Sequence, residues 1–209
     1  MKEEKIILVT NTVPYYEDFA EIKNKIWLML DNAIKDRGSP FRIPVFICGG
    51  QDDFDGRIVV LRKSDQENNL VQYHSDIRSD KIAKLKANKN AAMLFYDKDE
   101  KIQVRLKVEC TVNHENVITK QSWLKTGHMS RKCYLVDNGP GTLSETPTSG
   151  LKPELDNFEF TMEQSEVGYK NFTVIQCKIK SMEWLYLAAK GHRRARFDLE
   201  TNKDTWLIP

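Results

Sequence analysis

Lys101-Ile102-Gln103-Val104-Arg105-Leu106-Lys107-Val108-Glu109-Cys110-Thr111-Val112 carries the clearest alternation of apolar and polar residues in the chain. From Ile102 to Cys110 every second side chain is apolar, and the side chains between them are polar or charged. Successive residues of a strand point to opposite faces of a sheet, so this pattern predicts a strand with one buried and one solvated face.

Shorter strand-like runs surround this strand, and turn-rich sequences separate them. The predicted runs are 41–48, 57–61, 70–74 and 91–96, with two closing strands at 173–179 and 182–187. Apolar residues at helical spacing predict helices at 17–37, 77–88 and 115–125. The polar segment 138–156 has no apolar period, and loops of that length are usually functional or mobile.

This order of elements predicts a mainly β protein, a small antiparallel β-barrel with helices. The chain of 209 residues is long enough for one sizeable core, so we expect a single domain over 1–209. Its core strands are predicted at about 41–112, a helical and loop excursion at about 113–160, and closing strands at about 170–200.

The composition argues against a nucleic-acid-binding protein and against a membrane protein. Lys and Arg exceed Asp and Glu by 32 to 30, and this balance gives no support for a nucleic-acid partner. No apolar run approaches the roughly 18 residues of a membrane span, and the apolar stretch 6–9 is too short for a signal peptide. We therefore expect a cytoplasmic protein without a membrane partner.

Cysteine and histidine usage predicts no metal site. Four cysteines lie far apart without a CxxC pair, mostly in apolar strand-like sequence, which favours reduced core residues: Cys48, Cys110, Cys133 and Cys177. The four histidines are equally scattered, and none stands at metal-ligand spacing from another His or Cys.

Two segments favour a phosphorylated ligand. Arg57 and Arg62 flank the apolar run 58–61, and guanidinium binds phosphate oxygens in a bidentate manner. The segment 73–81, Tyr-His-Ser-Asp-Ile-Arg-Ser-Asp-Lys, then predicts a helix start capped by Ser75 or Asp76. Free backbone N–H groups there would join the side chains of Arg78, Ser79 and Lys81 around one anion.

Two further sets of residues are candidates for ligand binding. Gln103 shares a strand face with Arg105 and is a candidate to hydrogen-bond a flat heterocycle, or else it faces water. Near the C-terminus, Trp184 precedes residues 192–196, His-Arg-Arg-Ala-Arg, where strand alternation places positions 192, 194 and 196 on one face.

In this order and spacing the segments resemble the FMN-binding split-barrel proteins related to pyridoxamine 5′-phosphate oxidase. Residues 57–62 match the family's R-x-V-L-L-K strand, residues 73–75 its Y-T-N/D turn and residues 78–81 its phosphate-binding R-S-x-K segment. Residues 88–96 are similar to N-P-x-A-A-L-x-F-Y, and residues 102–105 to R-Q-V-R. The resemblance spans roughly 42–112 and returns at 184–197.

The resemblance implies an antiparallel, Greek-key FMN-binding split barrel that forms a homodimer with FMN between the subunits. Arg57, Arg78, Ser79 and Lys81 would hold the phosphate, and Gln103 would hydrogen-bond the isoalloxazine ring. The backbone of 59–61 and the turn at 73–74 would line that ring, and the closing strands would complete the site. The full set of expected cofactor contacts is Arg57, Ile58, Val59, Val60, Leu61, Arg62, Tyr73, His74, Arg78, Ser79, Lys81, Gln103, Trp184, Arg194 and Arg196.

The chain departs from the family on the substrate side. Where the oxidase has a Y-x-x-x-R-x-x-x-S pattern, residues 123–131 read Trp-Leu-Lys-Thr-Gly-His-Met-Ser-Arg, and the family's Gln-Ser pair has no counterpart. Arg62 replaces the substrate-facing lysine, which keeps the charge and changes the donor geometry. The candidate substrate contacts are Arg62, Ser130, Arg131 and His192.

The leading hypothesis is therefore an FMN-dependent oxidoreductase that performs two-electron chemistry on an unidentified small molecule. The alternative is a non-catalytic split barrel that binds flavin or haem, with His74, His128 or His192 as the iron ligand. An interaction protein without any ligand is a third hypothesis, and the three separate cationic clusters argue against it.

Overall fold

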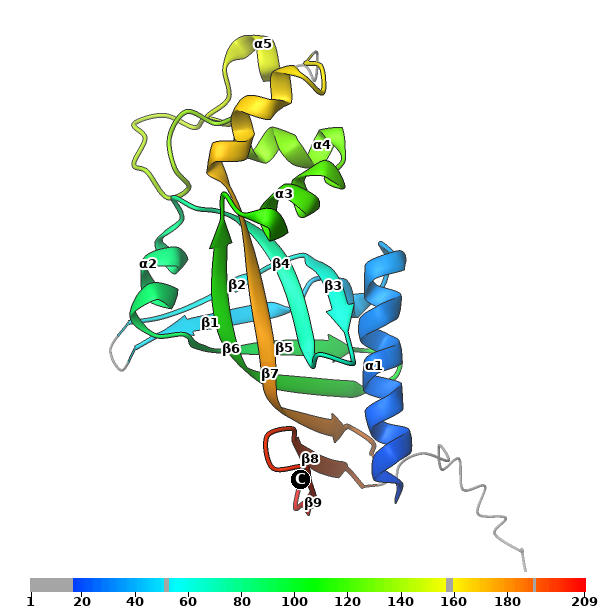
Figure 1. Cartoon of the computed structure of the whole chain (residues 1–209). Helices are drawn as coiled ribbons and strands as arrows, with labels where there is room; N and C mark the ends of the chain where they lie inside the picture. Colours follow the sequence, from blue (N-terminus) through cyan, green and yellow to red (C-terminus); the bar gives the residue numbers. More distant parts are fainter. Residues whose placement is uncertain (1–16, 51–52, 157–159, 190) are drawn as a thin grey trace, which may run out of the picture.

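The computed structural model describes residues 17–50, 53–156, 160–189 and 191–209 of the chain (Figure 1). The apolar stretch 6–9 lies outside these residues. The described strands form one antiparallel sheet in the order β2-β1-β5-β6-β7-β4-β3, and β8 and β9 extend it from β7. The strands are β1 (Val45–Gly49), β2 (Phe54–Ile58), β3 (Leu61–Asp65), β4 (Leu70–Asp76), β5 (Asn90–Asp97), β6 (Ile102–His114), β7 (Phe172–Tyr186), β8 (Arg193–Asp198) and β9 (Lys203–Leu207).

The sheet curves around an apolar core, as the alternation in β6 predicts. Every apolar residue of its inner face is buried, namely Ile102, Val104, Leu106, Val108 and Cys110. The inner faces of β1, β5 and β7 add Phe46, Phe95 and Trp184 to the same core. Interleaved polar residues of β6 such as Arg105 and Lys107 are exposed.

The barrel is split between β2 and β3. The sequence predicts one continuous strand over 57–61, and this prediction is wrong, because β2 ends at Ile58 and β3 begins at Leu61. Val59 leaves the ladder and its N–H donates to the carbonyl of Pro44 at 3.1 Å. Within the described chain these two strands pair with β1 and β4 and not with each other, so the sheet stays open, and the predicted split barrel is confirmed.

Other strand predictions need smaller corrections. Residues 41–48 begin as a 3₁₀ turn, η2 (Pro40–Arg42), because Pro40 cannot donate to a ladder. The two predicted closing strands are one strand, β7, whose pairing with β6 shifts register near Lys180. Strand β9 was not predicted from the sequence; it pairs with β8 and places Trp206 in a stack with Phe19, ring centroids 4.4 Å apart.

Helices cover both sides of the barrel (Figure 1). The predicted first helix is confirmed as α1 (Phe19–Lys35), capped by the Asp18 carboxylate and packed along β3 and β8 through its buried face. On the opposite side lies α2 (Asp80–Ala87). No described helix is both long and apolar enough to cross a bilayer.

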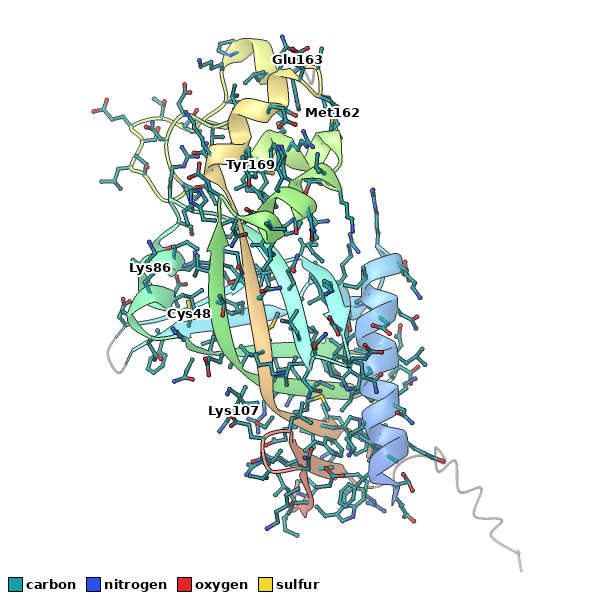
Figure 2. All side chains as sticks on the ribbon, in the orientation of Figure 1. Cys48, Lys86, Lys107, Met162, Glu163 and Tyr169 are labelled. Atoms are coloured by element: carbon teal, nitrogen blue, oxygen red, sulfur yellow. The ribbon has the colours of Figure 1, made fainter. Side chains whose placement is uncertain are left out.

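A second group of helices lies beyond the ends of β6 and β7 (Figure 1). Its members are α3 (Val117–Leu124), α4 (His128–Arg131), η3 (Lys132–Tyr134), α5 (Pro153–Asp156) and η4 (Gln164–Asn171). Trp123, Tyr134 and Phe172 form a small separate core there. Val117, at the start of α3, is 72% exposed, so the first turn of this helix does not contribute it to that core. Figure 2 shows Tyr169 and Met162 in this lobe, away from the barrel.

Candidate functional site

The predicted phosphate-binding residues largely come together where β4 leads into α2. We call Arg57, Ser75, Ser79 and Lys81 the Lys81 cluster. The Lys81 Nζ donates to Ser75 Oγ at 2.8 Å and to Ser79 Oγ at 3.0 Å, and an Arg57 Nη donates to Ser79 Oγ at 3.3 Å. The two cations therefore meet at the Ser79 hydroxyl, and Lys81 also donates to the Ser75 hydroxyl.

Among the residues that the structure describes, the ammonium of Lys81 has no carboxylate partner. The residue is 8% exposed, and within the described chain its ammonium donates to hydroxyl groups only. Burial, together with the nearby Arg57, lowers the pKa of Lys81 to about 8. A buried cation is costly unless an anion compensates it, so the surroundings of Lys81 fit an anionic ligand.

Arg57 is partly neutralised and partly free. It forms ion pairs with Asp55 and with Asp80, the latter at 3.0 Å, and this contact lowers the pKa of the Asp80 carboxyl. Its Nε is buried and has no hydrogen-bond partner in the described part of the protein. One donor of the guanidinium therefore remains available within the Lys81 cluster.

The start of α2 differs in detail from the prediction. Ser75 and Asp76 belong to strand β4, and the helix begins one turn later with Ser79 at the N-cap position. The predicted capping by Ser75 or Asp76 is therefore wrong, because the ladder with β7 extends to Asp76. Ser79 makes no capping hydrogen bond, since its hydroxyl accepts from the two cations instead.

Arg78, also predicted to hold phosphate, is turned toward the long loop. It forms a two-point pair with Asp76, at 2.7 and 2.9 Å, and donates to the carbonyls of Val136 and Asp137. Gly139 packs so closely on Arg78 that an added Cβ would lie 2.9 Å from its Cβ. In this structure Arg78 anchors the start of the 137–156 loop beside the Lys81 cluster.

Arg62 lies at the other end of the split, in a different environment. It lines a cavity of about 580 Å³ between β3, β4, β7, the end of α1 and the segment from α3 to α4. His74 and Ser130, two other predicted contacts, line the same cavity. Burial and then Arg62 lower the pKa of His74 to about 4, so this imidazole is neutral at pH 7. We call this space the Arg62 cavity.

Two predicted cofactor contacts face the barrel core. Tyr73 and Trp184 are each 0% exposed, and Tyr73 packs on Phe46 with ring centroids 4.9 Å apart. The predicted turn at 73–74 is part of strand β4, so alternate side chains point to opposite faces. His74 therefore faces outward while Tyr73 faces inward, where burial raises its pKa. Neither aromatic side chain reaches a surface site.

Three further predicted contacts, Gln103, Arg194 and Arg196, lie on the outer face of β6, β7 and β8. Arg105, Arg194 and Arg196 all pair with Glu183, the last two at 2.6 and 3.3 Å, and we call these four residues the Glu183 cluster. Burial alone would raise the pKa of Glu183, but the hydrogen bonds from Arg105 and Arg194 lower it below its usual value. Three cations on one carboxylate leave a surplus of positive charge.

Gln103 lies in the next row of the same face. It stands opposite Leu185, which in turn stands opposite Arg194. Of the predicted shared face of positions 192, 194 and 196, the part formed by 194 and 196 is confirmed, because Ala195 between them and Phe197 after them are buried. His192 precedes β8 and is exposed.

Arg131 has a structural role in place of the predicted substrate contact. It is 2% exposed and pairs with Glu166, with its guanidinium carbon 4.4 Å from the ring centroid of Trp123. It also donates to the carbonyls of Trp123 and Thr126. The other candidate iron ligand, His128, contacts the carbonyl and ring of Phe160.

Several residues of these sites were not predicted from the sequence. Arg42 and Lys125 add cations to the Arg62 cavity, and Gln72 and Gln176 add amides. Arg105 was noted only as a neighbour of Gln103. Local sequence could not have marked it, because Arg105 and Glu183 become partners only once β6 and β7 are paired.

The predicted core cysteines are mostly confirmed. Cys48, Cys110 and Cys177 are buried and free, while Cys133 is exposed, contrary to the prediction. In the described part of the chain no three His, Cys, Asp or Glu side chains are grouped closely enough to hold a metal ion.

The fold and these clusters define an antiparallel split-barrel protein with a cationic site at the Lys81 cluster. Residues 49–114 match the model of the pyridoxamine 5′-phosphate oxidase, FMN-binding domain. The motif-based resemblance to pyridoxamine 5′-phosphate oxidase-related FMN-binding proteins is therefore confirmed. A comparison with curated proteins gives no match.

Solved structures share the fold at low identity. A pyridoxamine 5′-phosphate oxidase-related, FMN-binding protein from Nostoc punctiforme PCC 73102 has a TM-score of 0.68 and 14% identity, covering 90% of this chain and 97% of its own. PhzG from Burkholderia lata 383, in complex with tetrahydrophenazine-1-carboxylic acid, has a TM-score of 0.68 and 16% identity, covering 96% and 99%. At such identities the likeness concerns the fold.

Proposed function

We propose that the protein binds FMN, with the phosphate at the Lys81 cluster, and acts as an oxidoreductase on a small molecule. The observation that carries the proposal is Lys81, a buried ammonium held by two hydroxyl groups without a carboxylate. A phosphate would supply the missing charge and accept from Lys81, from Arg57 Nε and from the serine hydroxyls. Arg78 contributes by anchoring the neighbouring loop and not by direct contact.

The isoalloxazine ring is proposed to lie along the split. Residues 59 and 60 lie between the ends of β2 and β3, so their backbone groups are not committed to a regular ladder. The segment leads from Arg57 in the Lys81 cluster to Arg62 in the Arg62 cavity. A nucleotide with its phosphate at the first arginine would therefore present its ring toward the second.

A second copy of the chain is proposed to complete the site. Ser75 of the Lys81 cluster pairs with Thr173 on β7, and Glu183 lies ten residues further along that strand, about 33 Å at about 3.3 Å per residue. The Glu183 cluster and Gln103 are thus far from the Lys81 cluster of the same protomer. Contacts to one FMN from both groups, as the family resemblance implies, need two protomers.

The outer face of β2, β1 and β5 offers the surface for that dimer. Phe54, Ile58 and Tyr96 are 72%, 63% and 47% exposed, and Val45 and Leu94 lie in the same row as Ile58. An exposed apolar face of a sheet is unusual in a monomer and favours association. The partner in this proposal is an identical chain.

Bound FMN would supply two-electron redox chemistry, and the side chains described above would position it and its substrate. The aromatic carboxylic acid bound by PhzG, which shares the fold, supports a small organic molecule as substrate. Pyridoxamine 5′-phosphate is a weaker candidate, because Arg131 is committed to Glu166 and Trp123.

The test is the absorption spectrum of the purified, untagged protein before and after incubation with FMN. We expect flavin bands and one FMN per chain, followed by reduction of the bound flavin when a substrate is found. A colourless protein that takes up no FMN refutes the proposal. Haem bands in place of flavin bands would support the alternative in which His74 ligates iron, and direct assay for pyridoxal 5′-phosphate and peroxide decides the oxidase reaction.

A further inference from the structure

Cys110 and Cys177 face each other across the neighbouring strands β6 and β7 (Figure 1). They stand directly opposite in the register of this strand pair, although 67 positions separate them in the chain. Their Sγ atoms lie 3.6 Å apart, and the two residues are 1% and 0% exposed. Both are free thiols in the core of the barrel.

The backbone around these cysteines brings their side chains as close as an antiparallel pair allows. The Cys110 N–H donates to the carbonyl of Lys89 at 2.8 Å, on the β5 side of β6. The Ile179 N–H donates to the carbonyl of Asn69 at 2.7 Å, on the β4 side of β7, and Cys177 two residues earlier has the same orientation. The two cysteines therefore form a non-hydrogen-bonded pair. In such a pair the Cα atoms are about 4.5 Å apart, which is within the range that a disulfide spans.

A β-bulge close to the cysteine pair gives the two strands local freedom. Val108 pairs with Ile179, but the next pair is Lys107 with Ser181, so Lys180 is the extra residue on β7. A bulge bends its strand and increases the local twist. The Sγ atoms need to approach by about 1.5 Å to reach a bond of about 2.05 Å, and the bulge allows β7 to make this adjustment.

A cavity of about 480 Å³ gives a small oxidant a route to Cys110. The cavity lies between α2 and β6, where Cys110, Val112 and His114 are alternate residues of one strand face. Leu85 of α2 lines it from the other side. Cys110 is the only cysteine among the described residues that line this cavity, so it is the thiol that an entering molecule meets first.

Cys177 has the complementary position. It is fully buried, and burial, together with the neighbouring Cys110, raises the pKa of its thiol well above the usual value. A protonated thiol reacts slowly with a peroxide, because the thiolate is the nucleophile. Cys177 therefore does not start an oxidation, and its contact with the Cys110 sulfur makes it the partner that completes one.

We propose that Cys110 and Cys177 form a reversible dithiol–disulfide pair, which hydrogen peroxide oxidises and a small thiol reduces. The Cys110 sulfur attacks one peroxide oxygen and the O–O bond breaks, so that Cys110 becomes a sulfenic acid and the other hydroxyl leaves as water with the Cys110 proton. The Cys177 sulfur then attacks the Cys110 sulfur, and the S–O bond breaks as a second water leaves with the Cys177 proton. The two thiols lose two electrons to the peroxide, and two molecules of a small thiol return them.

The disulfide would join the helical lobe to the barrel at its base. The segment between the two cysteines carries the described helices from α3 to η4, and the bond closes this segment into a loop. Closing a long loop restricts the unfolded chain, so the oxidised protein is expected to melt about 5–15 °C higher than the reduced protein. No part of the reaction requires FMN, so the inference goes beyond the proposed function and does not depend on it.

The test treats the whole native protein with a few equivalents of hydrogen peroxide, after reduction and desalting, with and without FMN. Trypsin places each of the four cysteines on a different peptide, with Cys110 on 108–120 and Cys177 on 171–178. Free thiols are blocked with a maleimide in urea before digestion. Mass spectrometry is expected to show these two peptides linked and the intact protein lighter by two hydrogens, and dithiothreitol is expected to reverse both changes.

Variants separate the roles of the two thiols. Cys177→Ala is expected to accumulate the Cys110 sulfenic acid, which dimedone traps, because no partner thiol remains. Cys110→Ala is expected to leave Cys177 unmodified, because the accessible thiol is gone. Cys48→Ala is the matched control, since Cys48 is a buried thiol of the same core on β1, and the link is expected to form as in the wild type (Figure 2).

Several results would overturn the proposal. They are a native protein that keeps all four thiols reactive, a link that involves Cys48 or Cys133, and a link between Cys110 and Cys177 that forms only after unfolding in urea. A linked protein that melts below the reduced one would also overturn it, because the bond would then distort the native strands. A protein that forms the expected link and binds no FMN refutes the proposed function alone.

Discussion

Replacing Lys81 by Met should have opposite effects on FMN binding and on the stability of the FMN-free protein. Without ligand, the ammonium is buried against two hydroxyl groups and repelled by Arg57. Lowering its pKa from 10.5 to about 8 corresponds to about 3 kcal/mol, at about 1.36 kcal/mol per pKa unit. Met removes this cost and also loses two hydrogen bonds, worth about 1–2 kcal/mol together.

The net expectation is a gain of about 1–2 kcal/mol for the FMN-free Lys81→Met variant, a rise of roughly 2–8 °C in melting temperature. FMN binding should weaken about ten- to hundredfold, because a charge-assisted hydrogen bond to the phosphate is lost. Calorimetry of the FMN-free protein and FMN titration by fluorescence quenching measure the two quantities. Lys86→Met on the same helix is the matched control and should change neither.

Two results would refute the reasoning about Lys81. An unchanged FMN dissociation constant would show that the FMN phosphate does not bind at the Lys81 cluster, even if the protein is a flavoprotein. A lower melting temperature for the FMN-free variant would mean that the ammonium stabilises the fold through its hydroxyl contacts. Functional sites often retain such locally unfavourable groups because the ligand compensates them.

Three further outcomes follow from the same structure. FMN affinity should fall as the pH rises through about 8, because Lys81 deprotonates there in the free protein, and Lys81→Met should flatten this profile. Ile58→Asp should yield a monomer by analytical ultracentrifugation with reduced FMN retention; a dimer of wild-type affinity would place the interface elsewhere. Arg131→Met should lower the free energy of unfolding by about 2–4 kcal/mol. The substitution removes the ion pair with Glu166, the contact with the Trp123 ring and the hydrogen bonds to two backbone carbonyls. Urea denaturation measures this loss, and an unchanged midpoint would contradict the structural role of Arg131.

Much of the barrel could be read from local pattern. The alternation in β6 and the helical period of α1 depend only on which face of an element is buried, and both were predicted correctly. Motif spacing likewise predicted the group formed by Arg57, Ser79 and Lys81. Ser79 and Lys81 are close in sequence, because α2 follows β4 directly in the chain, and the family motif added Arg57.

The sequence by itself therefore determined the fold class, the family resemblance and most of the Lys81 cluster. Only the tertiary structure decided that residues 57–62 break into two strands and that Tyr73 and Trp184 point into the core. It also decided that Arg131 is neutralised by Glu166 while Arg62 and Arg42 share a cavity without a carboxylate. The physical reason is that the net charge felt by a side chain depends on partners brought together by long-range pairing, which no local pattern encodes.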